Sequence, residues 1–257
     1  MNIFVQLIKS LYSPKDIATY RNQGMWKTIF YILLLGVICL IPPIIITSIL
    51  VNHISTGVNH VMENLPDFEI KDAQLESSLE EPVYFDEGEL TIIFDSTGTI
   101  TESNIKSKFD SIGFLKNGVV FNFDGNVDTI EYKSIELYEL SKSDIESAIH
   151  SVQSLVPLFY VGMVIFILAG LFFNVTILAV VGLIIRRALQ ISISYGQLWK
   201  LSAYAITLAT VFFTIMSALQ ISIPFSGIIN WAVFVIMLYL TLKEVKKDEP
   251  DTFTQIQ

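Results

Sequence analysis

The amino-acid sequence predicts an α-helical membrane bundle of four transmembrane helices, with a small extracytoplasmic α+β domain inserted between helices 1 and 2. Three observations predict this fold class. Leu155 to Ile185 is a run without any charged residue, and at ~1.5 Å per residue it exceeds the ~30 Å hydrocarbon layer of a bilayer. Arg186 and Arg187 follow it, which places that end in the cytoplasm. Hydrophobic residues make up 52% of the 257 residues and charged residues 16%, as in integral membrane proteins.

Acidic charge is concentrated in one stretch of the chain. Residues 51–154 contain 20 of the 25 acidic residues and 6 of the 16 basic ones, so this stretch carries −14 and the rest carries +5. A basic remainder suits the anionic inner leaflet, and no pattern indicates nucleic-acid binding. Cys39 is the only cysteine, so no intramolecular disulfide can form. The acidic stretch must fold by packing alone, which suits a bacterial envelope.

The N-terminal segment, residues 1–27, is expected to be cytoplasmic and amphipathic. Apolar residues recur with helical spacing from Ile3 to Leu11. This predicts a helix that lies on the inner membrane surface or packs against other cytoplasmic segments. Ser13, Pro14 and Asp16 have the positions of an N-cap, a first-turn proline and an N3 carboxylate, so a second helix should begin at Pro14.

Residues 28–51 are the first predicted transmembrane helix. Arg21 and Lys27 precede it and place its start in the cytoplasm. No signal-peptide cleavage pattern follows the run, so we expect a retained anchor. Pro42 and Pro43 lack backbone N–H groups and are a candidate helix break. Packing distortion is the favoured interpretation and a gate is the alternative.

Residues 52–154 are too long and too varied for a loop and should form the extracytoplasmic α+β domain. A helical extension that ends at Pro66 should open it, and a helix that starts at Ser141 should lead into the second span. Short alternating or apolar runs predict three strands, at Glu89 to Phe94, Gly118 to Phe123 and Thr129 to Leu140. Turn signals flank two of these strands, at Asn117-Gly118 and Asp124-Gly125.

The C-terminal half supplies the remaining spans. The predicted segments are transmembrane helix 2 at 155–185, a cytoplasmic interfacial loop at 186–200, transmembrane helix 3 at 201–221, an outer turn at 222–227, transmembrane helix 4 at 228–242 and a cytoplasmic tail at 243–257. Lys243, Lys246 and Lys247 mark the cytoplasmic end of the last span. Both termini are therefore expected in the cytoplasm.

One motif resembles a catalytic loop. Asp95-Ser96-Thr97-Gly98-Thr99 follows an apolar strand, as in the phosphorylation loop of P-type ATPases. However, Ser96 replaces the lysine of that loop, and no nucleotide-binding domain follows. A strand that ends in a polar turn is the better explanation.

Metal binding has two weak candidates. Asn122, Asp124, Asn126 and Asp128 alternate as calcium ligands do, but Val127 and Lys133 occupy the glycine and glutamate positions of an EF-hand. A turn is favoured, and weak divalent binding by the acidic surface stays open. The three histidines, His53, His60 and His150, have no further ligands that the sequence can place. We expect no catalytic residue, no cofactor and no metal.

Polar residues inside the predicted spans are few. No charged residue lies near the middle of a span, which argues against an ion-coupled transporter. Asn174 lies in the second span, and the third span carries a polar stripe on one face, formed by Thr207, Thr210, Thr214 and Ser217. Bundle packing is the favoured role of this stripe. The alternative is a translocation face for lipid headgroups or a small solute.

Three patches resemble a bacterial membrane family called domain of unknown function 1189, which occurs mainly in Gram-positive bacteria and is sometimes labelled maltodextrin-utilisation protein. The patches are Ser13 to Ala18 with Tyr20-Arg21, Ile93 to Gly98, and Ser194 to Lys200 with Tyr204-Ala205. The resemblance implies a bacterial plasma-membrane location and brings no activity. The segment before the third span is also similar to Yip-type membrane proteins of vesicle traffic, too weakly to transfer a function.

The sequence thus predicts a non-enzymatic integral plasma-membrane protein, an accessory, scaffold or sensor. Its extracytoplasmic domain would contact an envelope component or a partner membrane protein. Membrane lipids are expected partners, together with another membrane protein or a second copy of this chain. The alternative function is transport of a small solute or lipid along the polar face of transmembrane helix 3.

Overall fold

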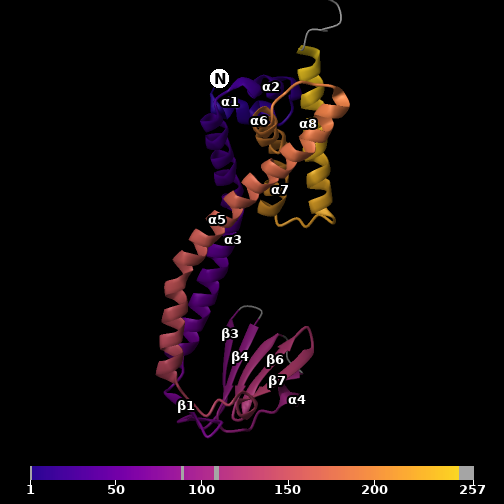
Figure 1. The fold of residues 1–257 in the computed structure, drawn as a ribbon. Coiled ribbons are helices and arrows are strands. Elements are labelled where there is room, and N and C mark those ends of the chain that lie inside the picture. Colours follow the sequence, from indigo (N-terminus) through magenta and orange to yellow (C-terminus); the bar gives the residue numbers. More distant parts are fainter. Residues whose placement is uncertain (1, 88–89, 107–109, 249–257) are drawn as a thin grey trace, which may run out of the picture. The chain divides into compact units, whose positions relative to one another are not determined.

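The computed structural model describes residues 2–87, 90–106 and 110–248 (Figure 1). The chain divides into two compact units. We call Met1–Ser48 together with Leu158–Gln257 the helical unit, and Ile49–Pro157 the sheet unit. The two long helices α3 and α5 contribute residues to both units.

Four helices are long and apolar enough to cross a membrane, which agrees with the predicted number of spans. They are α3 (Met25–Asn64), α5 (Lys142–Leu189), the pair α6 (Tyr195–Ala205) and α7 (Thr207–Ala218), and α8 (Ser226–Asp248). Helix α5 begins at Lys142, next to the helix start predicted at Ser141, and continues through Pro157 into the predicted span. Helix α8 also extends beyond the predicted 228–242 at both ends.

The connection before the third span is shorter than the predicted loop at 186–200. Helix α5 continues to Leu189, and α6 begins at Tyr195. Ser194 starts α6 with a capping box: its hydroxyl accepts from the Gln197 N–H at 3.3 Å, and the Gln197 side-chain oxygen accepts from the Ser194 N–H at 2.9 Å. Two satisfied backbone donors are enough to begin the helix there.

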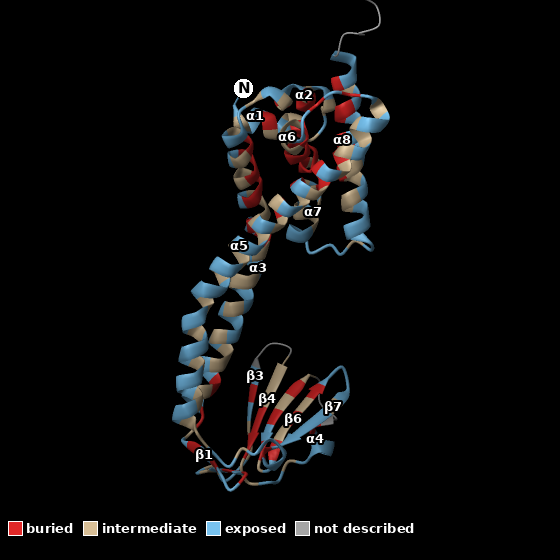
Figure 2. Ribbon diagram, viewed as in Figure 1, coloured by how far each residue is buried: buried red, intermediate tan, exposed pale blue. Residues whose placement is uncertain are grey.

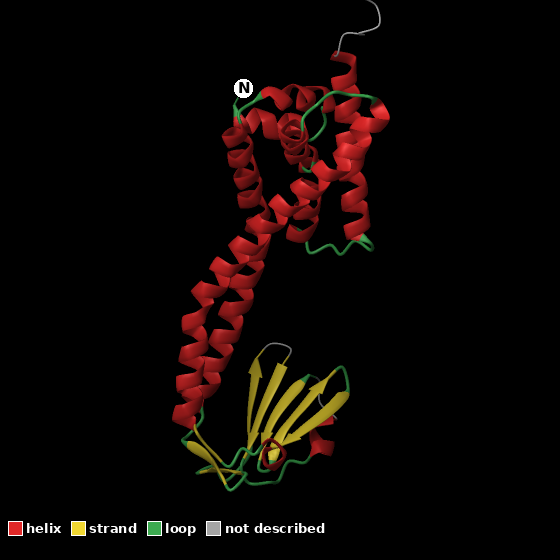
Figure 3. Cartoon of the chain, viewed as in Figure 1, coloured by secondary structure: helices red, strands yellow, loops and turns green. Residues whose placement is uncertain are grey.

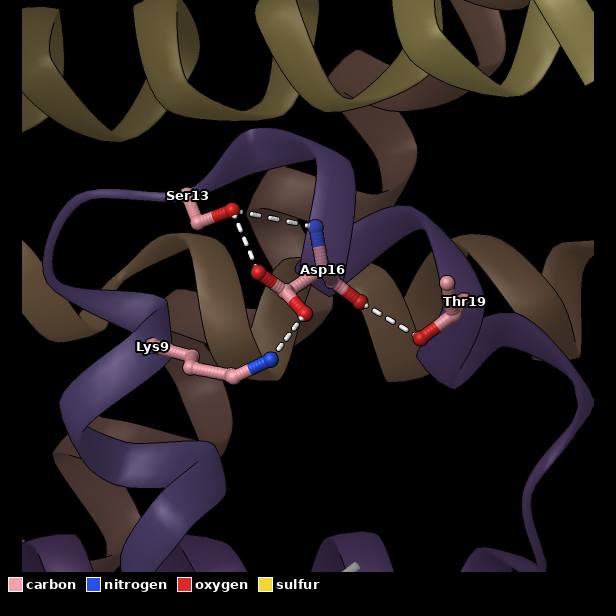
Figure 4. A network of polar contacts seen from close by, with 4 residues as sticks. All are labelled: Lys9, Ser13, Asp16 and Thr19. Atoms are coloured by element: carbon pink, nitrogen blue, oxygen red, sulfur yellow. Dashed lines mark hydrogen bonds and ion pairs between the residues drawn. The ribbon is translucent and has the colours of Figure 1, made fainter.

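The N-terminal segment folds into α1 (Ile3–Ser10), α2 (Pro14–Thr19) and the 3-10 helix η1 (Tyr20–Asn22). The predicted N-cap is confirmed, because the Ser13 hydroxyl accepts from the Asp16 N–H at 3.3 Å (Figure 4). The Asp16 carboxylate accepts from the Ser13 hydroxyl at 2.6 Å and pairs with Lys9 at 2.5 Å. The hydrogen bond with Lys9 lowers the pKa of Asp16 and raises that of Lys9.

The helical unit packs around buried residues of α3, α5, α6 and α8. Figure 2 shows these buried residues along α6 and on the inner faces of its neighbours. Gly36 of α3 permits a close approach to α5, because a Cβ there would lie 2.3 Å from the Leu168 side chain. Helix α3 continues through Pro42 and Pro43, which both lie inside it. Neighbouring hydrogen bonds keep the segment helical although two donors are missing.

The sheet unit contains two sheets (Figure 3). The smaller sheet has the order β2-β1-β8, with strands β1 (Phe68–Lys71), β2 (Gln74–Ser77) and β8 (Glu139–Ser141). The larger sheet has the order β3-β4-β5-β6-β7, with strands β3 (Val83–Glu87), β4 (Leu90–Asp95), β5 (Ser111–Leu115), β6 (Gly118–Phe123) and β7 (Asn126–Glu131). Strands β4 and β5 are parallel and joined through α4 (Glu102–Lys106), whereas the other pairs are antiparallel.

Strand prediction succeeds where turns are marked by glycine. Strand β6 has the predicted bounds, and the turn after it has left-handed backbone at Asp124 (φ 51°) and Gly125 (φ 79°). Strand β4 matches the first predicted strand, Glu89 to Phe94, although Glu89 lies outside the described residues. The strand predicted at Thr129 to Leu140 is wrong. There β7 ends at Glu131, the 3-10 helix η2 (Tyr132–Ile135) follows, and β8 joins the other sheet.

Candidate functional site

The predicted polar stripe of the third span faces α3 at two positions. Thr207 is fully buried, and its hydroxyl lies 2.5 Å from the Tyr31 hydroxyl. Thr214 donates to the Thr210 carbonyl at 2.8 Å and lies 3.5 Å from the sulfur of Cys39. Ser217 is exposed at the end of α7, where it lines a pocket of about 550 Å³. The stripe therefore contributes hydrogen bonds to helix packing over most of its length.

Asn174 lies half-buried on α5, and no hydrogen bond joins it to the stripe in the described part of the chain. Two residues further along α5, Thr176 accepts from the indole N–H of Trp199 at 3.2 Å. The ring of Trp199 also stacks on Phe172, with centroids 6.2 Å apart. This part of α5 therefore serves as a docking face for α6.

The residues predicted to set the topology lie at helix ends. Arg21 donates to the Ala18 carbonyl at 2.8 Å and pairs with Asp248 at 3.3 Å. Arg186 donates to the Ile193 carbonyl, which fixes the loop after α5. The other members of the set lie near the start of α3, the end of α5 or the end of α8: Lys27, Arg187, Lys243, Lys246 and Lys247.

The sequence did not reveal a buried polar cluster in the helical unit. The Gln6 side chain donates to Gln23 at 2.9 Å, Tyr204 donates to Gln6 at 3.2 Å, and Gln23 donates to Tyr204. The rings of Tyr20 and Tyr31 pack against Tyr204, with centroids 4.7 Å and 4.1 Å away. Tyr204 therefore joins the N-terminal helices to α3 and α6. The patch Tyr204-Ala205 was the only sequence signal for this cluster.

Asp95 is a structural residue of its loop, as the turn interpretation predicts. Its fully buried carboxylate accepts from the N–H groups of Thr97 (2.9 Å), Gly98 (3.2 Å) and Ile100 (2.6 Å), and from the hydroxyls of Thr97 (2.6 Å) and Thr99 (3.4 Å). Burial by itself raises the pKa of Asp95, but these hydrogen bonds outweigh burial and lower it. Both oxygens are thus committed to the turn, in contrast to those of a nucleophile.

The predicted calcium-type ligands do not gather. Asn122 is buried on β6 and donates to the Ile105 carbonyl at 3.1 Å, while the Asp124 N–H donates to Asp110 at 2.9 Å. Within residues 2–87, 90–106 and 110–248, no group of three or more histidine, cysteine, aspartate or glutamate side chains could hold a metal ion. His53, His60 and His150 belong to no such group.

The most distinctive cavity lies in the sheet unit, and we call it the sheet groove. Its volume is about 460 Å³, and all its lining residues are apolar or aromatic. Strands β4, β5 and β6 form one wall with Leu90, Ile92, Phe94, Ile112, Phe114 and Val119. Helices α3 and α5 form the other wall with Val58, Val61, Met62, Leu65, Ile145 and Ile149.

The strand residues of this wall follow from alternation along the sheet. In β4, Leu90, Ile92 and Phe94 point to the groove, because alternate residues share a face. Ile93 points the other way and packs with Ile105 of α4. The larger sheet is therefore apolar on both faces, although α4 covers only one of them.

A second cavity, the helix-pair groove, adjoins the sheet groove. Its volume is about 560 Å³, and it runs between the sheet-unit parts of α3 and α5. The two cavities share four lining residues, Val58, Leu140, Ile145 and Ile149. At its far end the helix-pair groove reaches Val51 and Val156, with Ser55, Asp144 and Gln153 as its polar lining. We call the two cavities together the apolar track.

Tyr132 borders the sheet groove with a buried ring. Its hydroxyl has no hydrogen-bond partner in the described part of the chain. Burial raises the pKa of this phenol, so it is protonated throughout the physiological range. An unsatisfied buried hydroxyl costs about 1–3 kcal/mol. No single motif marks the track, because its residues are spread from Val51 to Val156.

The chain was compared with protein families, curated proteins and solved structures. The model of the family described as "Protein of unknown function (DUF1189)" matches residues 4–242. The chain belongs to this family. The matched range contains the whole sheet unit, so the apolar track lies within the DUF1189 region. No curated protein and no solved structure matches the chain.

Proposed function

We propose that this DUF1189 protein is a non-enzymatic, multi-pass protein of a bacterial plasma membrane, which acts as a sensor or accessory of another membrane system. Its sheet unit lies outside the cytoplasm and binds an apolar part of an envelope component. The sheet groove of the apolar track carries this proposal, because a cavity of this size that is lined only by apolar and aromatic side chains is built for a hydrophobic ligand.

The proposed orientation rests on charge. Arginine or lysine residues lie at the ends of α3, α5 and α8 that belong to the helical unit, and residues 51–154 carry −14. The positive-inside rule then places both termini in the cytoplasm and the sheet unit outside. Plasma-membrane residence follows from the family resemblance.

The helical wall of the track supports a sensing role. Its helical wall consists of α3 and α5, and both helices continue into the helical unit without interruption. A ligand that shifts these helices therefore has a covalent connection to the membrane bundle. Transport along the polar stripe is less well supported, because Thr207 and Thr214 are engaged with α3 and their own helix.

Site-specific photocrosslinking in native membranes tests ligand binding. A photoreactive residue is placed at position 114 on the groove wall or at position 123, which is an exposed phenylalanine of the same sheet outside the groove. We expect a defined adduct with an envelope component at position 114 and none at position 123. Equal or absent labelling at both positions would overturn the binding role.

The orientation has a separate test in intact cells. In a Cys39→Ser background, Ser134→Cys puts a thiol on the sheet unit and Gln190→Cys puts one on the loop after α5; both positions are exposed. A membrane-impermeant maleimide should label Ser134→Cys in intact cells and Gln190→Cys only after permeabilisation. The reverse pattern would contradict the proposed topology.

A further inference from the structure

We infer that the apolar track is a binding site for one acyl chain of a membrane phospholipid, with the headgroup left at the rim of the helix-pair groove. This inference rests on the proposed function and names the chemical class of its ligand. Three observations carry it: the chemistry of the walls, the length of the track, and the helices on which its open end lies.

The walls exclude polar ligands. The sheet groove is lined only by apolar and aromatic side chains, and the Tyr132 hydroxyl is buried. A sugar, peptide or ion would lose its hydration there without gaining hydrogen bonds, at several kcal/mol for each polar group. A hydrocarbon chain has no polar group to dehydrate, and its binding removes the apolar walls of the groove from water, which contributes ~25 cal/mol for each Å².

The face of the larger sheet opposite α4 is only partly covered by the helical wall and by the smaller sheet. Antiparallel sheets that face water on one side alternate apolar and polar residues. Here the second face presents Ile92, Ile112, Phe114 and Val119, and Phe114 is 36% exposed. The helical wall leaves a cavity of about 460 Å³ against this face. Its volume lies within the range of ligand pockets, about 300–1,000 Å³.

The length of the track suits a linear chain. On α3 its lining residues run from Val51 to Met62, which is ~17 Å at the helical rise. One leaflet contributes about half of the ~30 Å hydrocarbon layer, so a single acyl chain spans ~15 Å. The track is therefore long enough for one chain, and a compact apolar molecule would leave most of it empty.

The open end of the track lies on the membrane-spanning helices themselves. Val51 and Val156 directly adjoin the charge-free runs of α3 and α5. Near this end, Ile54 and Val152 are 57% and 66% exposed. Apolar side chains at these positions suit contact with lipid. Because the two helices lead from hydrocarbon to the groove, the membrane is the source of the ligand, and Ser55 and Gln153 can contact the ester or headgroup.

Photolabelling of the full-length protein tests the inference. The protein is reconstituted in phosphatidylglycerol and phosphatidylethanolamine vesicles that contain a phospholipid with a diazirine near the end of one acyl chain. After irradiation, labelled peptides are mapped by mass spectrometry. We expect labels on strands β4, β5 and β6, which only a chain in the track can reach, in addition to the spans.

Two matched pairs of variants sharpen this test. Phe114→Asp puts a carboxylate on the groove wall, and Phe123→Asp makes the same change at an exposed phenylalanine outside the groove. Ala148→Trp fills the helix-pair groove, whereas Ser147→Trp adds the same bulk at the neighbouring exposed position, outside its lining. We expect Phe114→Asp and Ala148→Trp to reduce strand labelling at least fivefold, and their controls to leave it within twofold. Circular dichroism verifies that all four variants are folded.

The outcomes distinguish a failure of the acyl-chain inference from a failure of the proposed function. Strand labelling that is absent in the wild type, or equal in Phe114→Asp and Phe123→Asp, overturns the acyl-chain site. If a protein or another apolar molecule then forms the adduct at position 114 in native membranes, the acyl chain is wrong and the proposed function stands. If no adduct forms in either experiment, both the acyl-chain site and the proposed binding function are wrong.

Discussion

The helical unit and the sheet unit differ in where their apolar and polar side chains lie. In the helical unit, Gln6, Ser10, Thr28, Ser202, Thr207 and Thr241 are buried, while Trp26 and Phe166 are 75% and 79% exposed. In the sheet unit, apolar residues form two cores and a lined groove, and acidic residues lie mostly at the surface. The exposed apolar side chains of the helical unit suit the proposed hydrocarbon surrounding, and the acidic surface of the sheet unit suits water.

This difference shows where each unit obtains its specificity. In hydrocarbon there is no hydrophobic driving force for packing one helix on another. For a unit inside a membrane, hydrogen bonds and close helix approaches would therefore select the arrangement. The cluster around Tyr204 and the contact at Gly36 fulfil those roles. In the sheet unit water itself drives the apolar side chains together, and buried polar groups such as Asp95 fix a single turn. The predictions below test this contrast.

Phe94→Ala should have the largest effect, and only in the sheet unit. Phe94 is 2% exposed and packs on Phe68 with ring centroids 5.1 Å apart. Truncating a buried phenylalanine costs about 3–5 kcal/mol. Hydrogen exchange of the full-length protein in micelles should show faster exchange in the strands and unchanged protection in α6 and α8. Phe123→Ala, at an exposed position of the same sheet, should change neither.

Asp95→Asn should make the sheet unit less stable by about 2 kcal/mol at neutral pH, because an amide cannot replace a carboxylate that accepts five hydrogen bonds. The lowered pKa of Asp95 stabilises the fold at every pH above the unfolded value, near 3.9. This contribution is lost as pH falls through the folded pKa.

Hydrogen exchange of the strands between pH 7 and pH 3 measures this difference. The variant should lose less stability than the wild type on acidification. Asp144 also has a lowered pKa, through its hydrogen bond with Ser141, but it is present in both proteins and cancels in the comparison. Parallel pH curves would show that Asp95 carries no such contribution.

One chemical change made in both units tests the contrast directly. Tyr204→Phe removes the hydroxyl that donates to Gln6 and accepts from Gln23, so we expect a loss of about 1–2 kcal/mol. Tyr132→Phe removes a buried hydroxyl without a partner in the described part of the chain, so stability should be unchanged or higher. Thermal unfolding in micelles compares the two variants. Equal losses would mean that the Tyr204 cluster does not hold the helical unit.

Sequence reasoning found the features that local chemistry encodes. The four apolar helices, the cap at Ser13 and strand β6 all follow from residues close together in the chain. Gly118 shows why a local signal can be sufficient. A Cβ there would lie 2.5 Å from the Ile130 carbonyl oxygen, so the hairpin of β6 and β7 requires a glycine that is visible in the sequence. The hairpin between β1 and β2 lacks such a sign, because Asp72 and Ala73 adopt left-handed backbone without glycine.

The candidate site could not be found in the same way. The track is formed by residues from α3, α5, the 3-10 helix η2 and strands of both sheets, and most of them are ordinary apolar residues in their local pattern. Alternation in Leu90 to Phe94 and the pair Ile112 and Phe114 could have shown that both faces of the sheet are apolar. The alternation does not show that β4 and β5 pair in parallel, with α4 in the connection between them. This pairing creates the groove wall.

Ser13→Ala should have the smallest effect, about 1 kcal/mol, and it tests the N-terminal edge of the helical unit. The hydroxyl caps α2 through the Asp16 N–H and donates to the Asp16 carboxylate, which also pairs with Lys9 (Figure 4). Lys15→Ala, at a neighbouring helical position without a capping bond, is the control. Hydrogen exchange should rise in α1 and α2 of Ser13→Ala alone. If protection around Tyr204 falls equally, the cap and the buried cluster form one cooperative unit, and the helical unit depends on its polar contacts even at its edge.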